Sequence, residues 1–282
     1  MYKIIDGKKL ASEFRLNLKN KIGEYIKERG EIGLAVILVG EDPASAVYVR
    51  NKIKACEEVG IKSSVYYLPE QTAQKDVEEL VTSLADNNKI HGILVQLPLP
   101  SHINAKKVLE LIPVGKDVDG FSAENIGKLC LNEECSVACT PYGVMKMLES
   151  EKIDVKGKRA VILGRSEIVG KPMSMLLLNA DATVTVCHSK TRGLKEICRE
   201  ADILIAAVGK AKFVTADMVK QDAVVIDVGI NRDENGKMCG DVDFENVKDK
   251  CSYITPVPGG VGPMTITMLM YNTYNAAIRS VN

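Results

Sequence analysis

Strand-like apolar runs and helix-like patterns alternate along the whole chain, and this alternation restricts the fold more than any other feature of the sequence. It is typical of parallel sheets covered by helices, because two parallel strands can be joined only by a long crossover. At 282 residues the chain exceeds the usual size of one domain, so we predict two α/β domains. We place the first domain at 1–139 plus 264–282, and a doubly wound, Rossmann-like domain at 140–263.

In the first half of the chain we expect three helices that alternate with three strands. Asp6 is suited to cap a first helix, and Pro98 with Pro100 ends a last strand. We expect helices over about 7–29, 44–59 and 73–87, and strands over 33–39, 63–68 and 90–97. The segment 113–140 shows little periodicity, so we interpret it as a connection between the domains.

The second half repeats the pattern in a more compact form. We expect strands over 159–163, 183–187, 203–208 and 223–228, with helices over about 170–179 and 191–200. The segment from Pro256 to Pro263 is too rich in Pro and Gly for a helix or a central strand. A helical pattern resumes over 264–278, and we expect that helix to pack back on the first domain.

Charge and hydropathy exclude several classes of protein. Lys plus Arg and Asp plus Glu number 37 each, so no overall field attracts nucleic acid or an anionic membrane. No apolar run approaches the roughly 18 residues of a membrane span, and the first residues lack the apolar core of a signal peptide. We therefore expect a soluble, cytoplasmic protein.

The eight cysteines do not suggest a disulfide framework, because most are scattered through strand-like or amphipathic segments. Cys130, Cys135 and Cys139 crowd one stretch, but they form no Cys-x-x-Cys pair and no histidine lies near them. We expect reduced thiols and no metal site, with a cysteine-based metal or redox module at 130–139 as an alternative.

Residues 158–172 predict a dinucleotide site. A buried strand runs into a turn and a helix punctuated by Gly164 and Gly170, which presents backbone N–H groups to a phosphate. Arg165 and Ser166 follow Gly164 where the usual fingerprint has a second glycine, and a guanidinium at this turn suggests a cofactor with an extra phosphate. The alternative is that the two glycines only allow the helix to pack against the strand.

The end of the next strand supports the same cofactor. An NAD site usually has a carboxylate there for the ribose hydroxyls, but this chain has His188, Ser189 and Lys190. Together with Arg165 they favour NADP, whereas Glu167 is an unfavourable neighbour for a phosphate. The nicotinamide end is expected near 207–209 and 228–230.

The first domain carries candidate catalytic groups. Tyr48 and Lys52 are four residues apart and share a helix face, where a paired phenol and amine can act on one ligand. The competing interpretation is a solvated basic face that includes Arg50 and Lys54. Gln96 closes a strand, and Asp119 lies on a tight turn suited to pairing with ring N–H donors.

Six motifs, in order along nearly the whole chain, resemble the bifunctional methylenetetrahydrofolate dehydrogenase/methenyltetrahydrofolate cyclohydrolase family. They are Tyr48-Val-Arg-Asn-Lys52, Val95-Gln-Leu-Pro-Leu-Pro100, Lys116-Asp-Val-Asp-Gly-Phe121, Gly164-Arg-Ser166, His188-Ser-Lys190 and Pro256-Val-Pro-Gly-Gly-Val-Gly-Pro-Met-Thr265. The resemblance implies an NADP-linked oxidation of methylenetetrahydrofolate and hydrolysis of the product to 10-formyltetrahydrofolate, in one-carbon metabolism. It also implies a homodimer paired through the cofactor domain.

The resemblance also implies roles for individual residues. Lys52 would activate water or move its proton, Gln96 would position Lys52, Tyr48 would stack on or orient the folate, and Asp119 would anchor the pterin. The folate would further contact Leu97, Pro258, Gly259 and Gly260. The cofactor would contact Gly164, Arg165, Ser166, His188, Ser189, Ile230 and Thr265.

Two other functions remain as alternatives. A different NADP-linked dehydrogenase, acting on a small carbonyl compound or amino acid, would not need Tyr48 and Lys52 partnered with Gln96. A non-enzymatic nucleotide sensor would bind NADP and leave Lys52 solvated. Tetrahydrofolate-dependent turnover by the purified protein separates these possibilities.

Overall fold

A computed structural model describes residues 2–280. Internal contacts divide the chain into two compact units. The large-sheet unit comprises the residues up to Ser12 together with Ala138–Thr265, and the small-sheet unit comprises Glu13–Val137 together with the residues from Ile266 onward. The domain bounds given above stay a prediction. The predicted class, two α/β units built on parallel sheets, is confirmed.

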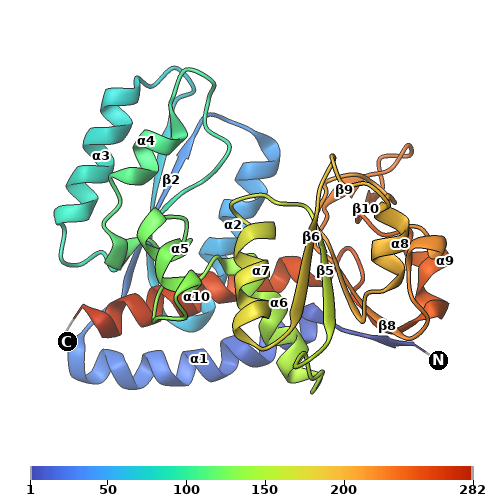
Figure 1. Ribbon diagram of the computed structural model, residues 1–282. Helices are drawn as coiled ribbons and strands as arrows, with labels where there is room; N and C mark the ends of the chain where they lie inside the picture. Colours follow the sequence, from blue (N-terminus) through green and yellow to red (C-terminus); the bar gives the residue numbers. More distant parts are fainter. Residues whose placement is uncertain (1, 281–282) are drawn as a thin grey trace. The chain divides into compact units, whose positions relative to one another are not determined.

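The small-sheet unit is built on three parallel strands with β2 in the centre (Figure 1). The strands are, in spatial order, β3 (Lys62–Leu68), β2 (Gly33–Val39) and β4 (Gly92–Val95). Every residue of β2 is buried, as expected for a strand covered on both faces. Ala35, Ile37 and Val39 pack in one core cluster with Val77 and Val81 of α3 (Gln74–Asp86).

Helices supply the rest of this unit. They are the greater part of α1 (Gly7–Arg29), α2 (Pro43–Val59), α3, α4 (Ala105–Glu110), α5 (Ala123–Cys130) and most of α10 (Val261–Arg279), with a 3-10 turn at Val114–Lys116. α1 and α10 lie side by side (Figure 1), where Tyr25 Oη donates to the Ala277 carbonyl at 3.1 Å and Tyr271 Oη to the Phe14 carbonyl at 3.2 Å. The C-terminal helix therefore packs on this unit, as predicted.

The large-sheet unit contains a six-stranded parallel sheet. Its strands are, in spatial order, β1 (Lys3–Ile4), β11 (Cys251–Ile254), β8 (Ala223–Asp227), β7 (Ile203–Ala206), β5 (Arg159–Leu163) and β6 (Thr183–Cys187). The chain begins the doubly wound part at β5, runs outward to β6 and then crosses to β7. The switch point between β5 and β7 is where such sheets bind ligands, beyond the carboxyl ends of the strands.

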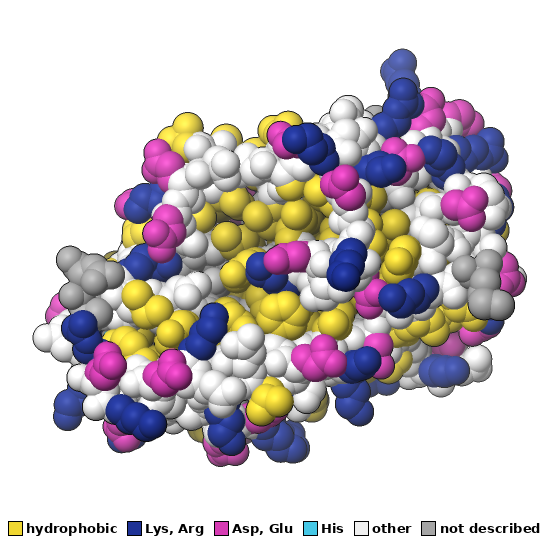
Figure 2. All heavy atoms as spheres, turned by 90° about the horizontal axis from the view of Figure 1, so that it is seen from below, with side chains coloured by type: hydrophobic (Ala, Val, Ile, Leu, Met, Phe, Trp, Pro, Cys, Tyr) yellow, Lys and Arg dark blue, Asp and Glu magenta, His cyan; other side chains and the backbone are white. Residues whose placement is uncertain are grey.

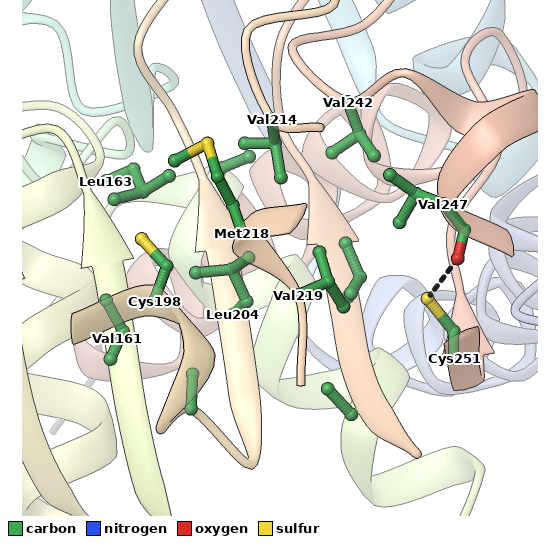
Figure 3. Close-up of a cluster of buried hydrophobic side chains, with 14 of the residues drawn as sticks. Val161, Leu163, Cys198, Leu204, Val214, Met218, Val219, Val242, Val247 and Cys251 are labelled. Atoms are coloured by element: carbon green, nitrogen blue, oxygen red, sulfur yellow. Dashed lines mark hydrogen bonds between the residues drawn. The ribbon is translucent and has the colours of Figure 1, made fainter. Parts of the chain in front are cut away.

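Shorter elements complete this unit. The helices are α6 (Cys139–Ser150), α7 (Gly170–Asn179), α8 (Leu194–Arg199) and α9 (Phe244–Val247), with 3-10 turns at Ala216–Met218 and Lys248–Lys250 and a hairpin of β9 (Asn231–Arg232) with β10 (Met238–Cys239). Figure 3 shows its apolar core, in which Val161, Leu163 and Leu204 of the sheet meet Cys198 of α8. Because the strands of this sheet are buried, their sequences are nearly continuous apolar runs.

Two expectations about connecting segments were wrong. The segment 113–140 contains α5, which Ser122 caps by accepting a hydrogen bond from the Asn125 amide at 3.2 Å. α10 begins at Val261, so Pro263 lies inside a helix rather than before it. A proline is tolerated there because the first-turn N–H groups have no intrahelical partner.

No helix within residues 2–280 is long and apolar enough to cross a membrane. Acidic and basic side chains are interspersed over the face drawn in Figure 2. This mixture agrees with the balanced charge of the sequence.

Candidate functional site

Helix α2 presents Tyr48 and Lys52 on one face. Asp42 caps the helix by accepting a hydrogen bond from the Ser45 amide at 2.7 Å, and Gly60 ends it in the left-handed conformation, with φ of 89°. Val49, Ala55, Cys56 and Val59 are buried, and Ala55, Cys56 and Val59 continue the stripe of Tyr48 and Lys52 toward the C-terminal end of the helix. Tyr48 is 36% exposed, and partial burial raises the pKa of its phenol.

Lys52 and Gln96 are joined directly. Nζ of Lys52 donates to Oε1 of Gln96 at 2.9 Å, and Nε2 of Gln96 donates to the carbonyl of Leu97 at 2.7 Å. Gln96 follows the last residue of β4, and its backbone N–H still donates to the Ile37 carbonyl at 2.9 Å. Because Oε1 and Nε2 of the Gln96 side chain both have partners, Oε1 is held facing the Lys52 amine.

The two carboxylates of the turn after Lys116 have different roles. Asp117 is 4% exposed and accepts hydrogen bonds from the amides of Gly120, Phe121 and Ser122 at 2.8–3.3 Å. Asp119 makes no hydrogen bond or ion pair within residues 2–280. Burial raises the pKa of Asp119 to about 6, and Asp117 adds to the rise whereas Lys52 opposes it. Asp119 is therefore the carboxylate available to a ligand, and Asp117 builds the turn.

A residue that the sequence analysis missed supports this turn. Asn272 on α10 is 2% exposed, and its Nδ2 donates at 2.8 Å to the carbonyls of both Val118 and Val137. Val118 is the neighbour of Asp119, so Asn272 holds the backbone from which that carboxylate projects. A polar residue within the apolar pattern of 264–278 was the one available signal.

In the large-sheet unit, Gly164 and Gly170 form the turn at the switch point. Gly164 has φ of 117°, and a Cβ on it would lie 2.2 Å from the Ala207 carbonyl oxygen. A Cβ on Gly170 would lie 2.2 Å from the Gly164 oxygen. Only glycine fits at either position, because the helix packs closely against the strand. The phosphate site predicted for this turn stays a prediction.

The side chains of this turn suit a phosphate. Arg165 is exposed and makes no hydrogen bond or ion pair among the described residues. The Ser166 hydroxyl accepts from the amides of Val169 and Gly170 at 3.2 and 3.4 Å, next to the first turn of α7. Glu167 forms an exposed ion pair with Lys171 at 3.2 Å, which partly offsets its charge.

The residues after β6 lie at the same edge of the sheet. Nδ1 of His188 accepts a hydrogen bond from the Lys190 amide at 3.1 Å, and the His188 amide donates to Oγ1 of Thr191 at 2.8 Å. Ser189 is exposed. No carboxylate follows β6 directly, so this edge offers donors to an anion rather than acceptors to ribose hydroxyls.

The remaining predicted residues lie in three places. Ile230, after β8, is 49% exposed. Oγ1 of Thr265 lies 3.0 Å from Oγ1 of Thr140. The loop of Pro258, Gly259 and Gly260 packs on the start of α1, where the Lys8 amide donates to the Gly259 carbonyl at 3.0 Å.

A second feature missed from the sequence is a buried acidic pair, Asp227 and Asp241, which are 3% and 0% exposed. Burial and the neighbouring Asp241 raise the pKa of Asp227 to about 7, against the effect of backbone hydrogen bonds. The sequence offered only a signal for tight packing, namely Gly229 and Gly240 beside the two acids.

The cysteine cluster shows no metal-binding geometry. All eight cysteines are free thiols. Within the described residues, no group of three or more His, Cys, Asp or Glu side chains could hold a metal ion.

Comparison with known proteins gives consistent matches along the chain. Residues 5–119 match the family model described as "Tetrahydrofolate dehydrogenase/cyclohydrolase, catalytic domain". Residues 138–281 match the model described as "Tetrahydrofolate dehydrogenase/cyclohydrolase, NAD(P)-binding domain".

Individual relatives cover nearly the full length. The "Bifunctional protein FolD" of Moorella thermoacetica is 58% identical over 98% of this chain and 99% of its own. The crystal structure of the bifunctional enzyme FolD from Campylobacter jejuni is 52% identical with a TM-score of 0.97, over 99% of this chain and 100% of its own. The Trypanosoma brucei enzyme, complexed with NADP cofactor and inhibitor, is 38% identical with a TM-score of 0.94, over 100% and 99%.

Proposed function

Since the chain belongs to the tetrahydrofolate dehydrogenase/cyclohydrolase family, we propose that Lys52, Gln96, Tyr48 and Asp119 carry out the family's chemistry in this protein. The protein is a bifunctional enzyme of one-carbon metabolism. It oxidises 5,10-methylenetetrahydrofolate to 5,10-methenyltetrahydrofolate with NADP, and it hydrolyses the methenyl product to 10-formyltetrahydrofolate.

The hydrogen bond from Lys52 to Gln96 is the single observation that best supports these roles. The side-chain oxygen of Gln96 orients the Lys52 amine without forming an ion pair with it. Gln96 also keeps its oxygen toward Lys52, because its Nε2 is engaged by the Leu97 carbonyl. The amine is thus held in position by a neutral partner.

In the hydrolysis, water adds to the methenyl carbon between N5 and N10 of the folate. The Lys52 amine takes a proton from that water as the carbon–oxygen bond forms. It then gives that proton to N5 as the bond between N5 and the carbon breaks. The second water proton leaves the hydroxyl oxygen for solvent as the carbonyl bond of the N10 formyl group forms. Proton transfer by a positioned side chain of this kind contributes typically about 10²–10⁴-fold to a rate.

Asp119 and Tyr48 bind the folate in this proposal. The carboxylate of Asp119 accepts hydrogen bonds from N–H donors of the pterin ring. It is available for them because it has no hydrogen-bond or ion-pair partner among the described residues. Tyr48 offers an exposed aromatic face at one helical turn from Lys52. Leu97 and the loop of Pro258, Gly259 and Gly260 complete the proposed folate contacts.

The donors at the switch point fit NADP. Without a Cβ, Gly164 and Gly170 let the end of β5 and the start of α7 pack closely, and the N–H groups at a helix start are suited to a phosphate. The 2′-phosphate side would be held by Arg165, Ser189, His188 and the exposed part of Ser166. The nicotinamide side would be held by Ile230 and Thr265. NADP supplies the hydride acceptor, and these residues contribute binding and orientation.

A homodimer through the cofactor domain is part of the proposal. β6 is the edge strand of the six-stranded sheet, and Val186 on it is 37% exposed. Leu178 at the end of α7 is 55% exposed. An open edge strand beside apolar side chains is suited to pairing with a second copy, which light scattering of the purified protein would detect.

We also propose that the enzyme works in the cytoplasm.

A paired assay tests the proposed function. Purified protein is given methylenetetrahydrofolate with either NADP or NAD, and formation and decay of the methenyl product are followed together. We expect both steps, and faster oxidation with NADP than with NAD. Absence of folate-dependent turnover would contradict the proposed roles, and equal rates with the two cofactors would contradict the phosphate site.

A further inference from the structure

Asp241 gathers hydrogen-bond donors from two segments at the cofactor end of the sheet. Its Oδ2 accepts from the amides of Val208 and Gly209 at 2.6 and 3.0 Å, and its Oδ1 accepts from the Lys210 amide at 2.9 Å. Oδ1 also accepts from Nδ2 of Asn231 at 2.9 Å. One carboxylate thus ties the loop after β7 to the segment after β8.

The hydrogen bonds to Asp241 orient the loop after β7 relative to the turn at Gly164. In a planar trans peptide the N–H and the preceding carbonyl point in opposite directions. The Val208 N–H points at Asp241, and the Ala207 carbonyl oxygen lies against Gly164, 2.2 Å from where a Cβ would be. The peptide between Ala207 and Val208 therefore lies between Asp241 and the proposed phosphate turn.

The same geometry determines where the next two carbonyls point. Because the Gly209 and Lys210 amides face Asp241, the carbonyl oxygens of Val208 and Gly209 point away from it. No hydrogen bond to either oxygen is found within residues 2–280. These oxygens are acceptors on the side of the loop opposite the carboxylate.

Asp241 is fully buried, and neither it nor Asp227 forms an ion pair in the described part of the chain. Burying a carboxylate is costly unless several donors compensate it. The packing is also tight, because a Cβ on Gly229 would lie 2.2 Å from Oδ1 of Asp241. A carboxylate suits this place because all four of its partners are donors.

We propose that Asp241 is a positioning residue for NADP. Its carboxylate sets the peptide planes of 207–210 against Gly164 and holds Asn231, the neighbour of Ile230, so that both segments are preformed for the cofactor. The inference rests on the NADP site proposed above. Asp241 itself does not touch the cofactor, and preorganisation of a loop increases affinity by lowering the ordering cost of binding.

The substitution Asp241→Asn tests this role with almost no change in shape. Either orientation of the new amide turns an NH₂ group toward two donors, so the loop loses its alignment. We expect the dissociation constant for NADP, measured by calorimetry without folate, to rise at least tenfold. The dissociation constant for NAD is expected to rise by the same factor, because the effect does not involve the 2′-phosphate. Amide hydrogen exchange at Val208, Gly209 and Lys210 is expected to accelerate.

Hydrolysis of added methenyltetrahydrofolate serves as the internal control, because that reaction consumes no NADP. We expect its rate in Asp241→Asn to stay within twofold of the wild type. Asp243→Asn is the matched variant, since Asp243 bonds to Asn246 at 2.7 Å and not to the loop, and its affinity for NADP should not change. Unchanged affinity in Asp241→Asn, or equal loss of NADP binding and hydrolysis, would overturn the proposal.

If Asp241→Asn does not fold, Asn231→Ala decides. It removes one of the four contacts, and we expect at least a threefold rise in the dissociation constant for NADP. A change of less than twofold overturns the proposal. Failure of the underlying NADP site is a separate result, because it would show as absent NADP binding in the wild type.

Discussion

Nζ of Lys52 donates a hydrogen bond of 2.9 Å to Oε1 of Gln96, so an amine on α2 and an amide at the end of β4 are directly joined. The two residues are 44 positions apart in the chain. Because Gln96 is itself held by the Leu97 carbonyl, the position of the amine depends on the backbone after β4. Five expected outcomes follow from this arrangement and from the sites around it.

Lys52→Met removes the proton-transfer group but keeps a side chain of similar length. We expect the cyclohydrolase rate to fall by about 10²–10⁴-fold, the contribution typical of such a group. Some dehydrogenase turnover should remain, because oxidation depends mainly on alignment. Lys54→Met, on the exposed part of the same helix, is the control and should retain both activities. Equal retention of both activities in Lys52→Met would falsify the role of Lys52.

Gln96→Ala leaves Lys52 without its orienting partner and frees the Leu97 carbonyl. Both activities should weaken, by about tenfold or more for loss of a hydrogen bond to an amine. Steady-state rates of methenyl formation and decay measure the effect. Gln74→Ala, which alters a side chain paired with Glu78 on α3, should leave both rates unchanged. Loss of only one activity would show that Gln96 does not act on a step common to both.

Arg165→Ala removes the exposed guanidinium beside Gly164. We expect the Michaelis constant for NADP to rise about 10–100-fold, which corresponds to a charge-assisted hydrogen bond, and that for NAD to change little. Arg159→Ala, at the opposite end of β5, is the control. An unchanged preference for NADP over NAD would exclude a contact between Arg165 and the 2′-phosphate.

Asp119→Asn tests the raised pKa of this carboxyl, about 6. A folded-state pKa above the unfolded value of 3.8 means that ionisation costs stability, and the cost develops as pH rises from about 4 to 6. The Tm of the variant minus that of the wild type should therefore be larger at pH 7.5 than at pH 4.5. Thermal unfolding at the two pH values measures this difference.

The control for Asp119 is Asp76→Asn, at the first turn of α3, where the pH dependence should not change in this way. Folate affinity of the wild type should rise as pH increases through about 6, because only the ionised Asp119 accepts from both pterin donors. A difference in Tm that is independent of pH would contradict the burial of Asp119.

Asn272→Ala removes a donor from the Val118 carbonyl, in a buried contact, and from the Val137 carbonyl, in a partly buried one. Each unsatisfied buried group costs about 1–3 kcal/mol, so the free energy of unfolding should fall by about 2–4 kcal/mol. The Michaelis constant for folate should also rise, because the Asp119 turn loses its support. Urea titration and steady-state kinetics measure the two effects, with Asn275→Ala, three residues along α10, as the control. A stable variant with an unchanged Michaelis constant would refute the support role.

Much of the fold was predictable because its signals are local. The bounds of β2, β5, β6 and α7 agree with the sequence expectations to the residue, since each is a short apolar or helical run between clear breakers. β1 was missed because two residues carry no periodicity, and it exists by pairing with β11, which is distant in sequence. The helix in 113–140 was missed because it spans only eight residues.

Some features of the candidate site were likewise predictable from local signals, and others depend on contacts between distant segments. Gly164 and Gly170 were predictable, because the positive φ of Gly164 and the close backbone contact at Gly170 both require glycine. The different roles of Asp117 and Asp119 were only partly predictable, because both lie on one turn and hydrogen bonding from surrounding amides distinguishes them. Asp241 and Asn272 carried no motif, since each acts on backbone groups from distant segments.

By itself the sequence determined the two α/β units, the strand–turn–helix proposed for the cofactor and the set of residues proposed to carry the chemistry. These features depend on apolar periodicity, glycine positions and residue type, all of which are local. Only the tertiary structure decided that Gln96 holds Lys52, that Asn272 supports the Asp119 turn and that Asp241 ties together the loops at the cofactor end. The physical reason is that these contacts join residues 31–154 positions apart, and packing of whole elements brings such residues together.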